Sequence, residues 1–256
     1  MEFFADLDFS AVWRFRWPLL AGLWTTIWLS VAAFLLAIPS GLLLALGRLK
    51  GGWLVNLPIM AFVDLMRFTP ILVQAVWIHF ALPVITGTSM TATQSALLAL
   101  TLHVSAYICD VMRAGITAVP KGQWEAARAL GLSNRQVFFD VVLPQVWPLV
   151  LPPLANVAVS TFKLTAILGI LAIDDLMKVT NRVNNIVFRP IELYTSAALA
   201  YLAVGLVLAS LAALVERRYG ADRLDRLARR ADAEAQRGLR GVAGAGPRSA
   251  VTPSDL

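Results

Sequence analysis

The sequence contains 256 residues, of which 58% are hydrophobic and only 15% are charged. Soluble domains use roughly 45–50% apolar residues, so this composition excludes an ordinary soluble protein and indicates a membrane protein. The formal net charge of +6 comes mainly from basic residues in the connections and the tail. Because the tail lacks interleaved aromatic residues, we expect no nucleic-acid partner.

Five apolar runs follow one another along the chain. The runs 18–47, 92–119 and 193–215 each reach the length of about 20 residues that a membrane-spanning helix requires. The runs 53–83 and 141–173 carry charges and prolines. We expect kinked helices there, because neighbouring helices can satisfy the backbone groups that proline frees. The sequence therefore predicts an all-α membrane protein with about five transmembrane helices.

Basic residues indicate the orientation, because lysine and arginine gather in cytoplasmic connections. They follow the first run, surround residues 120–144 and recur in the tail, whereas the connection 82–93 is uncharged. We therefore predict an extracytoplasmic segment 1–17, a transmembrane domain 18–216 and a basic cytoplasmic tail 217–256. The acidic N-terminus lacks the positive region of a signal peptide, so we expect no cleavage.

The tail permits two interpretations. Alternating charges and leucines at helical spacing are compatible with a short surface helix that contacts anionic lipid headgroups. The simpler interpretation, a solvated segment that fixes the topology, is the one we favour. From Gly238 onward the sequence is rich in glycine, alanine and proline, and we expect disorder there.

The polar loop 120–144 lies between the third and fourth runs. We predict a helix over 120–130, because proline suits the first helical position and alanines favour helix. Gly131 can end this helix in a left-handed cap, and Ser133 with Gln136 fits a capping box that opens a second helix. The small residues and the glycine turn favour a docking surface for a cytoplasmic partner; a solvated connection is the alternative.

The stretch EAARALGLSNRQVFFDVVLP resembles the EAA loop of membrane subunits of ATP-binding-cassette importers. The positions that match are Glu125, Ala126, Ala127, Gly131, Leu143 and Pro144. The stretches FVDLMRFTPILVQ, GITAVPKGQWEAARALG and PPLANVAVSTFK extend the resemblance to the polar amino-acid permeases over most of the chain.

This resemblance implies a type I importer fold in the bacterial inner membrane. Two permease subunits, identical or homologous, would each rest the EAA loop on a cytoplasmic ATPase dimer, and an extracytoplasmic solute-binding protein would deliver an amino-acid-like solute. Residues Glu125, Ala126, Ala127 and Gly131 would then couple ATP hydrolysis to transport. The sequence has no phosphate-binding loop of the form G-x-x-x-x-G-K-[ST]. We therefore expect hydrolysis in the partner subunit, and no catalytic residue or cofactor here.

Ionisable residues inside the runs are candidates for function. Asp110 and Arg113 are three residues apart and are predicted to pair, as are Asp64 and Arg67. Lys163 has no acidic residue within ten positions. Its partner must therefore come from another helix, a backbone carbonyl or a ligand. Two roles are open: Lys163 pairs with Asp64 or Asp110 on a neighbouring helix, or it lines the solute path.

The permeases that the chain resembles often carry Lys-Asp-Thr or Lys-Asp-Ser at this point, beside the translocation path. Here the residues are Lys163, Leu164 and Thr165. The resemblance thus implies that Lys163 and Thr165 border the path, and the missing aspartate favours a neutral or acidic solute over a cationic one.

The remaining polar candidates favour structural roles. His79 and His103 lack neighbours at ligand spacing, so we expect no metal site. Cys109 is the only cysteine and is expected to be a packed thiol. Three alternatives to an amino-acid permease remain: a permease for another small solute, a secondary transporter that works alone, and a membrane scaffold that does not transport.

Overall fold

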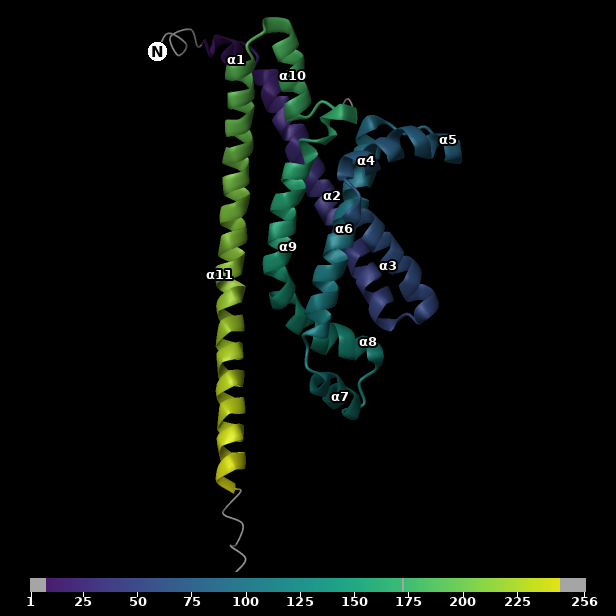
Figure 1. Cartoon of the computed structure of the whole chain (residues 1–256), viewed down its shortest axis with the longest axis vertical. Helices are drawn as coiled ribbons and strands as arrows, with labels where there is room; N and C mark the ends of the chain where they lie inside the picture. Colours follow the sequence, from purple (N-terminus) through teal and green to yellow (C-terminus); the bar gives the residue numbers. More distant parts are fainter. Residues whose placement is uncertain (1–7, 172, 245–256) are drawn as a thin grey trace, which may run out of the picture.

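The computed structural model describes residues 8–171 and 173–244, with side chains up to residue 218. Described residues form helices joined by short connections (Figure 1). The first half contains α1 (Ser10–Arg14), α2 (Arg16–Lys50), α3 (Trp53–Phe68), α4 (Ile71–Val76), the π-helical turn η2 (Trp77–Ala81), α5 (Leu82–Thr86) and α6 (Ala92–Thr117). The second half contains α7 (Lys121–Ala129), α8 (Asn134–Gln136), the π-helical turn η3 (Val137–Val142), α9 (Leu143–Thr165), the 3-10 turn η4 (Leu168–Leu171), α10 (Leu176–Val187) and α11 (Pro190–Gly244).

Four described helical segments are long and apolar enough to cross a membrane, and up to five if a bent pair counts as one span. The bent pair joins Trp53–Phe68 to Ile71–Thr86 at an angle of 109°. In Figure 1 α1, α5 and α10 lie toward one end of the molecule, and the loop with α7 and α8 lies toward the other. The arrangement confirms the predicted all-α fold, and it replaces the expected kink in the second run with a sharp break.

Reporter fusions test the predicted orientation. A reporter that is active only outside the cytoplasm should be active when fused at Thr86, at the end of α5, and inactive when fused at Gly238. The reason is that the basic residues cluster around the α7 loop and the tail, and basic connections remain in the cytoplasm. A cytoplasmic reporter at Thr86 would show that the five-span topology is wrong.

Small residues let α2 and α6 approach closely at the centre of the molecule. Ala33, Ala37, Gly41 and Ala45 recur every four residues on α2, and all four are buried. A Cβ atom at Gly41 would lie 2.6 Å from Ile108 and 2.9 Å from the carbonyl oxygen of Ser105 on α6. Such small-residue contacts replace the hydrophobic effect as the source of helix association within lipid.

Large apolar side chains cover the outer faces of several helices. On α11 the exposed residues include Leu199, Leu202, Leu206 and Leu214, and only 6% of its most apolar 18-residue window is buried. An apolar, unburied helix of this length is suited to contact with lipid chains. Lipid is therefore the natural neighbour of this face.

The fourth run ends as a helix earlier than predicted. The helix stops at Thr165, and residues 168–171 form a 3-10 turn, so the expected continuation to residue 173 is wrong. An apolar composition does not by itself distinguish a helix from an irregular apolar segment. In the tail, α11 continues to Gly244. Residues 245–256 lie outside the described part, and the disorder expected from Gly238 onward stays a prediction.

A short helix that the sequence analysis did not predict, α10, follows this turn. Its apolar residues Leu176, Val179 and Val183 are buried against the start of α2 and α11. Asp175 caps its first turn by accepting a hydrogen bond from the Lys178 amide at 2.8 Å. Burial raises the pKa of the Asp175 carboxyl to about 6, since burial disfavours the charged form. The cap and the buried face fix α10 against the starts of α2 and α11.

Candidate coupling loop and solute path

The loop between α6 and α9 folds as the local sequence predicts. Helix α7 follows Pro120, and Gly131 has a φ of +79°, which confirms the left-handed cap. The Ser133 side chain accepts a hydrogen bond from the Gln136 amide, and the Gln136 side chain accepts one from the Ser133 amide. The predicted capping box is therefore present, and it opens a helix that runs on from Asn134 into α9.

The four predicted coupling residues do not share one surface. Glu125, Ala126 and Gly131 are exposed, but Ala127 is only 4% exposed and packs in the same cluster as Val137 and Phe138. The expected small-residue surface is thus wrong at Ala127. A larger side chain there would push α7 away from η3, so its small size serves packing instead.

A concave region of about 480 Å³ lies beside α7. Its apolar floor includes Trp124 and Phe138, and its charged residues are Lys50, Lys121, Glu125 and Arg128. Lys121, Glu125 and Arg128 all line this region, so they share one face of α7. An apolar floor with charges of both signs is typical of a protein-docking surface.

Lys163 lies on the outside of α9 near its end. Its side chain is exposed and makes no hydrogen bond or ion pair among the residues that the structure describes. The alternative pairing with Asp64 or Asp110 is therefore absent from this part of the chain. Asn156 and Ser160 are also exposed, and the spacing of four and then three residues places all three on one helical face. A polar face of this kind is unfavourable in contact with lipid, so we expect this face of α9 to contact water or another protein chain.

Thr165 lies differently from Lys163. It is fully buried, and its hydroxyl donates a hydrogen bond to the Phe162 carbonyl at 2.7 Å. Within the single chain, Thr165 supports the end of α9 beneath Lys163 and does not face the surface.

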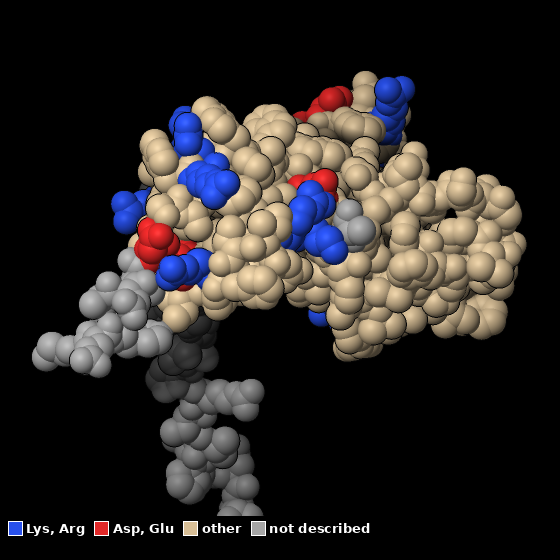
Figure 2. Space-filling model, turned by 90° about the horizontal axis from the view of Figure 1, so that it is seen from above, with Lys and Arg blue, Asp and Glu red and all other residues tan. Residues whose placement is uncertain are grey.

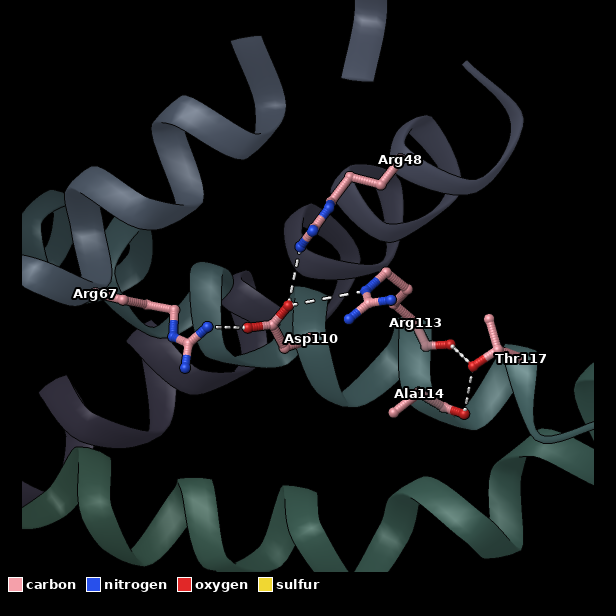
Figure 3. Close-up of polar contacts among 6 residues, drawn as sticks. All are labelled: Arg48, Arg67, Asp110, Arg113, Ala114 and Thr117. Carbon is pink, nitrogen blue, oxygen red and sulfur yellow. Dashed lines mark hydrogen bonds and ion pairs between the residues drawn. The ribbon is translucent and has the colours of Figure 1, made fainter. Parts of the chain in front are cut away.

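Asp110 on α6 gathers arginines from three helices (Figure 3). Its Oδ1 lies 2.9 Å from Arg48 Nη1 on α2 and 4.0 Å from Arg113 Nε, and its Oδ2 lies 2.5 Å from Arg67 Nη1 on α3. The predicted pair of Asp110 with Arg113 is confirmed, although it is the longest of the three. The predicted pair of Asp64 with Arg67 is wrong, because Arg67 turns to Asp110 and Asp64 makes no ion pair within the described residues.

The Gln74 side chain supplies hydrogen bonds to backbone carbonyls at the break between α3 and α4. Pro70 has no N–H, so the Met66 carbonyl loses the donor that a continuous helix would give it. The side-chain Nε2 of Gln74 donates a hydrogen bond to this carbonyl at 2.8 Å and another to the Thr69 carbonyl at 3.1 Å. Its Oε1 lies 3.1 Å from His103 Nδ1 on α6, which ties the break to the centre of the bundle. Sequence reasoning missed this role, because it depends on contacts between helices.

Replacing Gln74 with leucine should destabilise the protein. It leaves two partly buried carbonyls and the buried His103 ring without their partner, and each unsatisfied buried group costs about 1–3 kcal/mol. The thermal unfolding temperature in detergent should fall clearly. Gln123→Leu is the matched control, since Gln123 is exposed. Equal unfolding temperatures for both variants would contradict this account of the break.

The face seen from above is unevenly charged. In Figure 2 the right-hand end, over α4 and α5, shows no charged side chain, and charged groups of both signs lie elsewhere on this face. The charged pairs beside α10 and the start of α11 include Arg182 with Asp174, and Arg189 with Glu192 at 3.4 Å.

The sequence of residues 37–221 matches the family described as binding-protein-dependent transport system inner membrane component. The chain belongs to this family. Its members are inner-membrane components, which agrees with the apolar helices described above.

Relatives of this permease family cover most of the chain. The glutamine transport system permease protein GlnP of Escherichia coli (strain K12) is 32% identical over 214 residues, which are 83% of this chain and 98% of GlnP. The arginine ABC transporter permease protein ArtQ of Haemophilus influenzae is 35% identical over 188 residues, 71% of this chain and 84% of ArtQ.

Solved structures agree with the family. A crystal structure of an amino acid ABC transporter with histidines superposes with a TM-score of 0.76 at 30% identity, covering 83% of this chain and 99% of that one. An inward-facing MetNI methionine ABC transporter superposes with a TM-score of 0.66 at 21% identity, covering 80% and 98%, and this likeness supports the fold alone. The predicted type I importer fold is confirmed.

Proposed function

We propose that this permease carries a polar amino acid or a similar solute into the cytoplasm, driven by ATP hydrolysis in a partner subunit. Family membership and likeness to the glutamine and arginine permeases support an amino-acid importer. The observation that carries the proposal is the α7 loop, in which exposed Glu125 and left-handed Gly131 stand beside a charged concave surface.

Each partner is assigned to a different surface. A cytoplasmic ATPase dimer docks on the α7 loop, where charges of both signs surround an apolar floor. A solute-binding protein delivers the solute at the opposite end, on the face of Figure 2. A second permease subunit, identical or homologous, completes the path, and membrane lipid covers α11.

Lys163 lines the solute path in this proposal. An exposed ammonium within an apolar helix needs acceptors, and the carboxylate of an amino acid supplies them. Asn156 and Ser160 extend the same polar face along α9. Thr165 supports the helix end behind Lys163 through its hydrogen bond to Phe162. With leucine at position 164, this stretch offers no carboxylate to a cationic side chain, so the preferred solute is neutral or acidic.

Purification of the intact complex tests the assignment. Native mass spectrometry of the tagged permease should find two permease subunits and two ATPase subunits. It should also find either a bound amino acid or the solute-binding protein. A permease that purifies without any ATPase, from cells that express the whole transport system, would contradict the proposal.

A further inference from the structure

The number of arginines around Asp110 is unusual for a simple ion pair. Arg48 and Arg67 already supply one hydrogen bond to each carboxylate oxygen, at 2.9 and 2.5 Å. Arg113 is a third cation, yet its Nε lies 4.0 Å from Oδ1, makes no hydrogen bond and is buried. Asp110 therefore has a spare partner that the observed conformation does not use fully.

The three arginines lie on three different helices, and only one of these helices also carries Asp110. Arg48 lies on α2, which packs along α6, and its side chain is only 16% exposed. Arg67 lies on α3 just before the 109° break, and its side chain is 39% exposed. Arg113 lies on α6 itself, one turn after Asp110, so it moves with the carboxylate whatever the other helices do.

We propose that Arg113 is a positioning residue that replaces Arg67 at Asp110 when α3 moves relative to α6 during transport. A partly buried carboxylate that loses a partner is costly, so an ion pair between moving helices resists separation. Because Arg113 lies on the same helix as Asp110, it can pair with the carboxylate after Arg67 leaves, which lowers the cost of separating α3 from α6. This inference rests on the proposed function, because α6 leads through three residues into α7, where the ATPase would drive the movement.

The inference predicts opposite effects for two variants. With Arg113→Gln the observed conformation keeps both hydrogen bonds to Asp110, but the carboxylate has no replacement when Arg67 leaves. The conformational change should slow. With Asp110→Asn the link between α3 and α6 weakens, and the change should occur without solute.

The experiment uses the full complex of permease, ATPase and solute-binding protein in proteoliposomes, and measures ATP hydrolysis with and without solute-loaded binding protein. For Arg113→Gln we expect normal assembly, retained basal hydrolysis and a loss of stimulated hydrolysis on the order of tenfold, which corresponds to about 1.4 kcal/mol. Arg113→Lys should restore most of the stimulation because it keeps the charge. Asp110→Asn should raise basal hydrolysis and lose the dependence on solute.

Arg14→Gln is the matched control, since Arg14 is exposed and makes no ion pair among the described residues. Stimulation of Arg113→Gln equal to the wild type would overturn the inference, as would failure of this variant to assemble, which would indicate a purely structural role. A wild-type complex without any stimulated hydrolysis would instead refute the proposed function itself.

Discussion

Uptake is expected to fall at least about tenfold when Glu125 is replaced by lysine, because like charges brought together across an interface oppose docking by roughly several kcal/mol. Gly131→Val should also reduce uptake. Position 131 has a φ of +79°, where a side chain costs about 1–2 kcal/mol. A Cβ there meets no atom within 4 Å, so the cost comes from the backbone alone and shifts the exposed turn. Uptake into cells that contain equal amounts of membrane-inserted protein measures both effects.

Gly122 provides the matched control for Gly131. It is also exposed and also has open space around a new Cβ, but its φ is negative, in the ordinary helical range of α7. Gly122→Val should therefore keep most of the uptake. Unchanged uptake and unchanged ATPase association in both Glu125→Lys and Gly131→Val would remove the coupling role from this loop.

Lys163→Met is expected to abolish uptake or strongly alter its solute preference while the complex assembles normally. Methionine keeps the length and the apolar stem of the side chain but removes the charge that would hold a carboxylate. Assembly should be retained because Lys163 makes no ion pair within the described residues, so its removal leaves no buried carboxylate unpaired. Basal ATP hydrolysis should also persist. Transport kinetics and size-exclusion profiles of the purified complex measure these effects.

Lys163→Arg and Ser160→Ala serve as the comparison variants. Arginine keeps the positive charge, and Ser160 lies on the same exposed face without a charge, so both variants should retain more transport than Lys163→Met. If Lys163→Met transports with the affinity and rate of the wild type, the solute path lies elsewhere.

Local sequence signals predicted the α7 loop well. Gly131, Ser133 and Gln136 act within a few residues of one another, so their spacing alone determines the left-handed turn and the capping box. Ala127 shows the limit of such reasoning. An alanine in a helix is compatible with an exposed face and with a buried one, and only the packing of α7 against the rest of the bundle decides between them.

Interactions between helices could not be predicted in the same way. The spacing of Asp64 and Arg67 suggested a local pair, but Arg67 reaches Asp110 on another helix. Similarly, Gln74 bonds to backbone carbonyls that the proline break leaves free, and to His103 far along the sequence. These contacts depend on how α3, α4 and α6 pack, which a periodic pattern in one segment does not encode.

The most direct test of the importer assignment is solute uptake into proteoliposomes that contain the permease with its ATPase, with the solute-binding protein supplied on the side opposite the ATPase. A panel of labelled amino acids serves as the probe. The account predicts uptake of a neutral or acidic amino acid that requires both ATP on the ATPase side and the binding protein. Uptake that proceeds without ATP, or that continues when the binding protein is omitted, would contradict it.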